Sequence, residues 1–271
     1  SVFPDEYVHN YVNSAKYVDT YIERHSCSHS VTVGKVLIPT LHNYQYEAVK
    51  SAALAPGNRW LFNDDTGLGK SAQALSTVRL LRFSRAQSFR MLIVCPAMVR
   101  EAWRKEVQRW LTGEDAGVID AGLKRKLSKK AAQRRDAAYA QQIIVISYNL
   151  LEQVIEREFD IIIWDEVHKL KNPMSTYFKM AQQFASVPIQ FGLSATAMPD
   201  KPVDFWGVGE ILWPGRFGTE FEFKQHYAEA SNNGYGWDYK GINTKHAEDL
   251  KFRLSQCSSR TVRQEVAHLL P

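Results

Sequence analysis

The sequence predicts an α/β fold with a mostly parallel β-sheet and helices on both faces. From about Leu41 onward, short apolar runs alternate with longer segments of helical period, which is typical of strand–helix–strand units. Several runs are apolar at successive positions, as expected for strands that are covered on both sides. With 271 residues, of which 45% are hydrophobic, the chain can bury a substantial core without disulfides or metal ions.

Six apolar runs are expected to form the strands of this sheet. They span residues 59–63, 91–95, 117–120, 143–147, 161–164 and 189–193. Segments of helix-like composition lie between them, at residues 70–82, 98–111, 124–140 and 175–184. Right-handed crossovers through these helices would make the strands parallel.

The chain divides into three parts by composition. Residues 1–40 do not fit the alternating pattern and are expected to form an N-terminal accessory segment. Residues 41–213 carry the alternating pattern and form the main lobe. Residues 214–271 are rich in Gly and aromatic residues, so loops and short helices at the sheet edge are expected there.

Charge and targeting signals bound the class of protein only loosely. Lys and Arg number 34 against 29 Asp and Glu, a balance that permits a nucleic-acid partner without requiring one. The sequence has neither a signal peptide nor an apolar run of the roughly 18 residues that a membrane span needs. We therefore expect an intracellular protein without a membrane partner, and Cys95 inside its apolar run is expected to be a buried, reduced thiol.

Residues 63–71 have the pattern of a phosphate-binding loop. They follow a predicted strand, contain Gly67 and Gly69, and open a predicted helix at Lys70 and Ser71. Backbone N–H groups at such a helix start bind phosphate oxygens, the Lys reaches the outer phosphates, and the Ser hydroxyl can bind magnesium. Asp64 stands where this pattern usually has Gly. A Gly-containing turn before a helix is the alternative.

A pair of acids follows the predicted strand at 161–164. Asp165 and Glu166 emerge at its carboxyl end, the edge at which open α/β sheets bind ligands. Asp165 is suited to hold magnesium, and Glu166 to polarise the attacking water. The alternative is a strand end with solvated acids, whereas a zinc site at His168 has no suitable ligand spacing.

In this order, the motifs resemble those of superfamily 2 helicase-like ATPases, specifically the Swi/Snf-type DNA translocases. The resemblance covers residues 41 to 271 and includes an Asp at the position of Asp64. It implies a RecA-like ATP-binding lobe. The matching segments are LHNYQ (41–45), DDTGLGKS (64–71), LIVCPAMVREAWRKEVQRW (92–110), ISYNLL (146–151), DEVHKLKN (165–172), SATAMPDKPVDFW (194–206) and RTVRQEVAHLLP (260–271).

This resemblance also implies a role for individual residues. Gln45 would read the adenine edge, and His168, Ser194 and Thr196 would couple the nucleotide site to DNA. The residues implied in binding ATP and Mg²⁺ are Asp65, Thr66, Gly67, Leu68, Gly69, Lys70 and Ser71 in the loop, with Ser71 and Asp165 on the metal and Lys70, Asp165 and Glu166 as the catalytic set.

The same resemblance implies the partners. Such motors work on double-stranded or branched DNA and need a second RecA-like lobe, so a monomer that carries both lobes is expected and this lobe alone is expected to turn over ATP very slowly. The segment GWDYKG (236–241) points to the annealing-helicase subgroup. A non-catalytic nucleotide- or DNA-binding scaffold and a P-loop kinase remain as alternative functions.

A basic segment, a segment with His and Cys, and several aromatic residues are less informative about function. The basic segment 123–135 is more typical of a solvated helix than of a phosphate contact, and the segment 25–29, with its two His and one Cys, matches no common zinc spacing. Three Trp residues at helical spacing are expected in the core, whereas the aromatic residues of the Gly-rich loop fit a packed lid or a partner contact equally well. These residues are Trp103, Trp110, Trp206, Tyr235, Trp237 and Tyr239.

Overall fold

The computed structural model describes most of the chain beyond residue 40. The described residues are 31–33, 36–38, 41–85, 89–120, 128–196, 202–232 and 237–269. Three sequence-based expectations concern residues outside this set. They are those for the His- and Cys-containing segment 25–29, for Tyr235 and for most of the accessory segment 1–40.

Within the described residues, a seven-stranded sheet forms the centre of the lobe, and all of its strand pairs are parallel. The strand order is β11-β3-β8-β7-β4-β6-β5. The predicted strands are confirmed, with bounds that shift by one or two residues. They are β3 (Arg59–Phe62), β4 (Met91–Cys95), β5 (Ala116–Val118), β6 (Ile143–Ser147), β7 (Ile161–Asp165) and β8 (Ile189–Leu193), joined at the edge by β11 (Ser258–Ser259).

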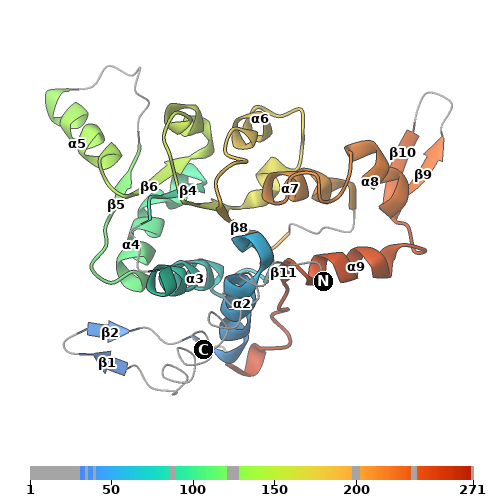
Figure 1. The fold of residues 1–271 in the computed structure, drawn as a ribbon, viewed down its shortest axis with the longest axis horizontal. Helices are drawn as coiled ribbons and strands as arrows, with labels where there is room; N and C mark the ends of the chain where they lie inside the picture. The colour runs from blue at the N-terminus through green and yellow to red at the C-terminus, as the bar shows by residue number, and fades with distance from the viewer. Residues whose placement is uncertain are drawn as a thin grey trace.

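Helices cover both faces of this sheet, as predicted (Figure 1). One face carries α2 (Asn43–Leu54), α3 (Lys70–Arg85) and α4 (Arg100–Trp110), and the other carries α6 (Thr176–Gln182) and α7 (Phe205–Leu212). The remaining helices are α5 (Lys129–Tyr139), α8 (Glu220–Tyr227) and α9 (Ala247–Ser255), with 3-10 turns η1 (Pro56–Asn58), η2 (Ala97–Val99), η3 (Tyr148–Val154), η4 (Val167–Leu170), η5 (Pro202–Asp204) and η6 (Ala267–Leu269).

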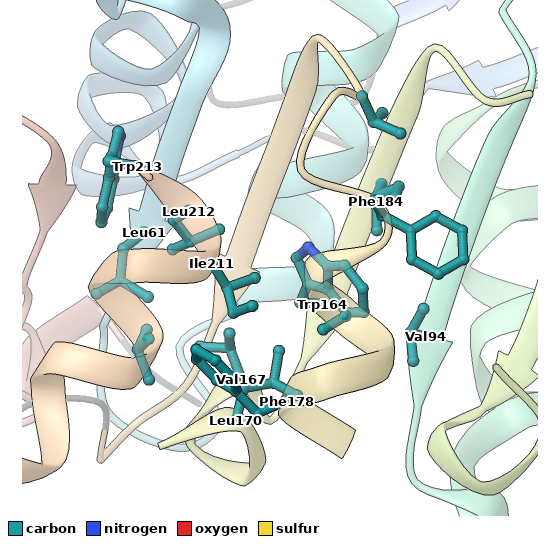
Figure 2. Close-up of a cluster of buried hydrophobic side chains, with 14 of the residues drawn as sticks. Leu61, Val94, Trp164, Val167, Leu170, Phe178, Phe184, Ile211, Leu212 and Trp213 are labelled. Atoms are coloured by element: carbon teal, nitrogen blue, oxygen red, sulfur yellow. The ribbon is translucent and has the colours of Figure 1, made fainter. Parts of the chain in front are cut away.

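The apolar runs fold as buried strands because successive side chains enter two different cores. In β7, Ile161 and Ile163 pack with α2, α3 and α4, whereas Ile162 and Trp164 pack with α6, α7 and α8. Figure 2 shows Trp164 in the middle of the second cluster. Its indole N–H donates to Gln190 Oε1 at 3.0 Å, so the buried polar group is satisfied.

The extension at 214–271 contains more strand than the sequence suggests. The strands β9 (Ala228–Asn232) and β10 (Trp237–Ile242) form an antiparallel hairpin, which projects at one end of the molecule beside α8 (Figure 1). A second antiparallel pair, β1 (Val31–Val33) with β2 (Val36–Ile38), precedes the lobe. Farther along the chain, β11 pairs with β3 and extends the main sheet by one strand.

Three central strands end at the same level, which places the predicted motifs together. Phe62 of β3 pairs with Leu193 of β8, and Leu193 pairs with Asp165 of β7. Because the strands are parallel, the residues that follow them leave the same edge of the sheet. The phosphate loop, the 194–196 loop and Glu166 are therefore neighbours in space.

Candidate nucleotide-binding site

A cavity of about 600 Å³ opens at this edge of the sheet. The phosphate loop contributes Lys70 and Ser71 to its wall, and the end of β7 contributes Asp165 and Glu166. These four residues, predicted for one site, thus lie on one cavity although about a hundred residues separate the two motifs in the sequence. Three other residues predicted to bind ATP, Asp65, Thr66 and Leu68, do not line it. The other lining residues are His42, Gln45, Gly67, Gly69, Ala72, Val99, Ala102, Trp103, Glu106, Arg109, Trp110 and Leu193.

The phosphate loop depends on two glycines with left-handed backbone. Gly67 has φ = 85° and Gly69 has φ = 81°, values that residues other than glycine rarely adopt. Gln45 approaches Gly69 so closely that a Cβ there would collide with its amide. The Gln45 Nε2 donates to Leu68 O at 2.9 Å, and its Oε1 accepts from His42 N at 2.8 Å. Gln45 therefore braces the loop, and its implied contact with adenine remains a prediction.

Lys70 lies at the centre of the loop. Its ammonium donates to Asp64 O at 2.7 Å and to Asp65 O at 3.1 Å. Burial lowers the pKa of Lys70, whereas the nearby carboxylates, led by Asp64 and Glu166, act in the opposite direction. A partly desolvated ammonium on the first residue of a helix, as Lys70 is on α3, is suited to hold a multiply charged anion.

Asp64, which replaces the usual Gly, is fully buried and has a structural use. Its Oδ1 accepts from Thr261 N at 2.7 Å, and its Oδ2 accepts from Gln73 Nε2 at 2.7 Å. The carboxylate thus joins the start of the loop to α3 and to the segment that follows β11. Asp65 points the same way, because its Oδ2 accepts from Arg263 N at 2.9 Å.

The acid at the end of β7 is held by two aromatic side chains. The Trp103 indole donates to Asp165 Oδ2 at 2.8 Å, and the Tyr148 hydroxyl donates to Asp165 O at 2.7 Å. Burial raises the pKa of Asp165, and Glu166 adds to this effect, while the Trp103 hydrogen bond opposes it. A bound cation would favour the charged form, so the carboxylate is set up to gain a positive partner.

Glu166 occupies a strained backbone conformation. Its φ of 51° and ψ of 51° are left-handed, which costs a non-Gly residue about 1–3 kcal/mol. The side chain meets His168, whose Nδ1 lies 3.1 Å from Glu166 Oε2. This hydrogen bond lowers the pKa of Glu166, in spite of partial burial, and keeps the carboxylate ionised at neutral pH.

The predicted coupling residues meet beside Glu166. His168 Nδ1 lies 3.1 Å from Ser194 Oγ and 3.5 Å from Thr196 Oγ1, and Ser194 Oγ accepts from Thr196 N at 3.1 Å. Because a carboxylate only accepts hydrogen bonds, His168 Nδ1 must carry the hydrogen when it donates to Glu166. The imidazole thus connects the acid to the 194–196 loop.

The donor set of the cavity fits magnesium. The Asp165 and Glu166 carboxylates and the Ser71 hydroxyl are hard oxygen ligands, the type that Mg²⁺ prefers, and all three residues line the cavity. Among the described residues, no group of three or more His, Cys, Asp or Glu is arranged to hold a metal by itself. Magnesium is usually bound in proteins by one or two side chains together with substrate phosphates, a role for which Ser71 and Asp165 have suitable oxygen atoms.

Two aromatic side chains have roles that the sequence did not reveal. Trp103 and Trp110 are buried in the core as predicted, but each also uses its indole N–H, toward Asp165 and Glu106 respectively. Tyr148 is buried and stacks on Trp164. Apolar spacing indicates burial only, so a hydrogen bond from a buried Trp could not be predicted.

The structure also shows where the basic helix, the hairpin Trp and the cysteines lie. Lys129, Lys130 and Arg134 of α5 are exposed, in agreement with a solvated helix face, and Trp237 is about half-exposed on the hairpin. Cys95 and Cys257 are free buried thiols, and burial raises the pKa of Cys95 to about 12. In the part of the chain that the structure describes, no helix is both long and apolar enough to cross a membrane.

Comparisons with known proteins agree with this geometry. The SWI/SNF-related matrix-associated actin-dependent regulator of chromatin subfamily A-like protein 1 of Xenopus tropicalis is 30% identical over 247 residues, which are 88% of this chain and 24% of that protein. The DNA annealing helicase and endonuclease ZRANB3 of Bos taurus is 26% identical and matches 81% of this chain and 20% of its own length. The chain thus spans about a quarter or less of these relatives.

The fold is also found in a solved structure. The Sulfolobus solfataricus SWI2/SNF2 ATPase core in complex with dsDNA superposes with a TM-score of 0.67 at 21% identity and covers 87% of this chain and 47% of its own. This likeness confirms the predicted RecA-like fold. The model of the SNF2-related domain matches residues 44–271. The chain therefore belongs to the SNF2-related domain family, as the motif resemblance predicts.

Proposed function

We propose that this chain is the ATP-binding lobe of a DNA-dependent ATPase that moves along or remodels double-stranded or branched DNA. The observation that supports it most is the shared cavity. Lys70 and Ser71 of the phosphate loop and Asp165 and Glu166 of β7 line the same space of about 600 Å³. A kinase or a scaffold module has no need for the His168 link to the 194–196 loop.

The residues divide the chemistry of hydrolysis among them. The backbone amides at residues 67–71 and the Lys70 ammonium would bind the phosphates. Ser71 and Asp165 would hold a magnesium ion, which would supply positive charge against the charge that develops on the phosphate oxygens. Glu166 is ionised and faces the cavity, so it can orient the attacking water and accept its proton. Because His168 contacts Glu166, Ser194 and Thr196, a movement of the Glu166 carboxylate would shift the imidazole and with it the 194–196 loop.

Two partners complete the proposal. Phosphoryl-transfer motors of this type need an arginine from a second lobe, worth on the order of a thousandfold in rate, so the 271 residues alone are expected to hydrolyse ATP very slowly. DNA is proposed because the matched Sulfolobus solfataricus core is described in complex with dsDNA. The relationship to an annealing helicase supports branched DNA among the substrates.

The test is ATP hydrolysis with and without DNA, measured on a protein that carries both lobes. Duplex and forked DNA should each stimulate turnover, and Glu166→Gln should bind ATP as the wild type does while turnover falls by about a hundredfold or more. Wild-type turnover in Glu166→Gln would remove the role given to this carboxylate. Strong DNA-stimulated hydrolysis by the 271 residues alone would contradict the need for a second lobe.

The same protein separates the alternatives. A scaffold would bind nucleotide or DNA without turnover, and a kinase would transfer phosphate to an acceptor independently of DNA. The basic helix α5 is a possible accessory DNA contact, which charge reversal at Lys129, Lys130 and Arg134 examines. If these three side chains contact DNA phosphates, the variant should show a weaker dependence of DNA affinity on salt concentration. An unchanged slope would mean that this face of α5 is only solvated.

A further inference from the structure

The segment that follows β11 contacts the start of the phosphate loop through both backbone and side chains. Asn63 N donates to Ser259 O at 2.9 Å, and Asp65 N donates to Thr261 O at 3.1 Å. In the other direction, Thr261 N donates to Asp64 Oδ1 and Arg263 N donates to Asp65 Oδ2. Residues 259–263, here called the C-terminal strap, thus hold residues 63–65 along their whole length.

Arg260 is the only strap side chain with partners in two loops of the site, among the described residues. Its Nη1 donates to Asn63 O at 2.6 Å and to Ala195 O at 3.0 Å, and its Nη2 lies 2.8 Å from Asp65 Oδ1. The planar guanidinium can serve several acceptors at fixed angles, which a Lys ammonium cannot reproduce. Arg260 therefore adds a side-chain link between the phosphate loop and the 194–196 loop, beyond the backbone bond from Ser194 N to Phe62 O where strands β8 and β3 end.

The energetics indicate that this contact serves geometry rather than stability. The Arg260 and Asp65 side chains are 44% and 29% exposed, so the ion pair is screened by water and contributes little to folding. Its acceptors, in contrast, belong to the segments that carry the reacting groups. Ala195 lies between Ser194 and Thr196, which surround His168 and through it Glu166.

Lys70 provides the link to nucleotide. Its ammonium donates to the carbonyl oxygens of Asp64 and Asp65, the residues that the strap holds from the other side. A phosphate that draws the ammonium toward itself weakens these two hydrogen bonds. The backbone at 64–65 then depends more on its remaining partners, which are the strap and the Gln73 amide, so a change at Lys70 reaches residues 259–263.

We propose that Arg260 is a positioning residue that couples nucleotide binding to the C-terminal strap. This inference rests on the proposed ATP site, and it adds a path by which that site communicates with the chain beyond β11. The ligand that acts on this contact is the phosphate-bearing nucleotide. Its binding changes how well the backbone of residues 259–263 is ordered.

The chain supplies a matched pair of variants. Arg260→Ala removes the side chain that joins the two loops. Arg263→Ala removes the same charge from the same segment but keeps its N–H bond to Asp65, and within the described residues the Arg263 side chain has no hydrogen-bond or ion-pair partner. Arg260→Lys keeps the charge but loses the planar fork.

The first measurement is the affinity of the 271-residue chain for a fluorescent ATP analogue with Mg²⁺. Arg260→Ala should bind about tenfold more weakly than the wild type, Arg260→Lys should lie between them, and Arg263→Ala should match the wild type. The melting temperature of Arg260→Ala should fall by about a few degrees, because the bonds to Asn63 O and Ala195 O are lost with the ion pair, so the affinities are compared at a temperature at which all four proteins are folded. Equal affinities for Arg260→Ala and Arg263→Ala would overturn the proposal.

The second measurement is amide hydrogen exchange in residues 257–266, with and without ATP. Exchange should slow on ATP binding in the wild type and in Arg263→Ala, and this response should be lost in Arg260→Ala even at saturating ATP. A response retained in Arg260→Ala would refute the coupling. A wild-type chain that binds no ATP at all would instead refute the proposed function, so the two failures are distinguishable.

Discussion

The two halves of the nucleotide site are held in place in different ways. The acids at the end of β7 are supported by side chains, since Trp103, Tyr148 and His168 each reach Asp165 or Glu166. The start of the phosphate loop is supported mainly through backbone groups of a segment almost two hundred residues later, where Ser259 and Thr261 contribute C=O and N–H groups. The acids therefore depend on a few replaceable side chains, whereas the loop depends on the path of the chain.

This difference has a consequence for mutation. Side-chain supports can be removed one at a time, and each removal should affect a specific carboxylate. Backbone supports survive most substitutions, so the loop should be sensitive only where a side chain takes part. The following experiments order these effects from the largest to the smallest.

Lys70→Ala should have the largest effect, on nucleotide affinity. Charge-assisted hydrogen bonds contribute about 1.5–3 kcal/mol each, so the loss of the ammonium should weaken ATP binding by at least about a hundredfold. Titration of the 271-residue chain with a fluorescent ATP analogue measures it. Binding within threefold of the wild type would show that phosphate is not held at this loop.

Trp103→Phe should reduce turnover without unfolding the lobe. The variant keeps an aromatic ring in the core but loses the hydrogen bond to Asp165, and the removal of such an outer partner of a metal-binding carboxylate typically costs about 10–100-fold. Steady-state ATPase assays of the two-lobe protein provide the measurement.

Trp206→Phe is the matched control for this variant. It makes the same chemical change, but its indole donates to Gly218 O and the residue does not line the cavity. Turnover should remain within about twofold of the wild type. If both variants lost turnover equally, the effect of Trp103 would be one of packing.

Substitutions of Asp64 should separate burial from hydrogen bonding. Asp64→Ala leaves Thr261 N without its partner and should destabilise the lobe by about 2 kcal/mol. Asp64→Asn should cost less than about 1 kcal/mol, because Gln73 Oε1 has no hydrogen-bond partner among the residues that the structure describes. It can accept from the new amide after the Gln73 amide turns. Urea unfolding of both variants tests this order, which equal losses would contradict.

Asp165→Asn should have the smallest effect on folding, and it should be favourable. The folded-state pKa of Asp165 is raised, so ionisation opposes folding, and the cost grows as pH rises above the unfolded value near 3.8. At pH 7 the neutral amide should raise the melting temperature, while Mg²⁺-dependent turnover is lost. The gain should shrink as pH falls through the unfolded value and vanish below about pH 3, where the carboxyl is protonated in both states, and a gain independent of pH would exclude this cause.

The central sheet and the motifs at its edge could be predicted because the signals are local. A run such as residues 161–165 is apolar at successive positions, and the acids follow directly. The strand β11 could not be predicted, since it consists of Ser258 and Ser259 and has no apolar pattern. The polar hairpin of β9 and β10, interrupted by an irregularity between Lys240 and Ile242, gives no clear alternation either.

The candidate site shows the same division. Some residues on the cavity wall, such as Lys70 and Asp165, could be predicted because they belong to sequence motifs, whereas others, such as Arg109 and Leu193, could not. Their supports depend on long-range geometry, and a sequence pattern says nothing about where the Trp103 indole points. The use of Asp64 as a link to Thr261 also needs the position of a segment that no local rule provides.

The late position of β11 in the chain bears on how the protein is made. The phosphate loop leaves the ribosome before the residues that hold it, 259–263, which follow after roughly two hundred more amino acids, or about 10–40 s of synthesis. Until then β3 has an unpaired edge, the kind of edge on which nascent chains associate wrongly. The nucleotide site is therefore among the last parts of the lobe to be completed, and slow translation of this stretch would prolong the interval of risk.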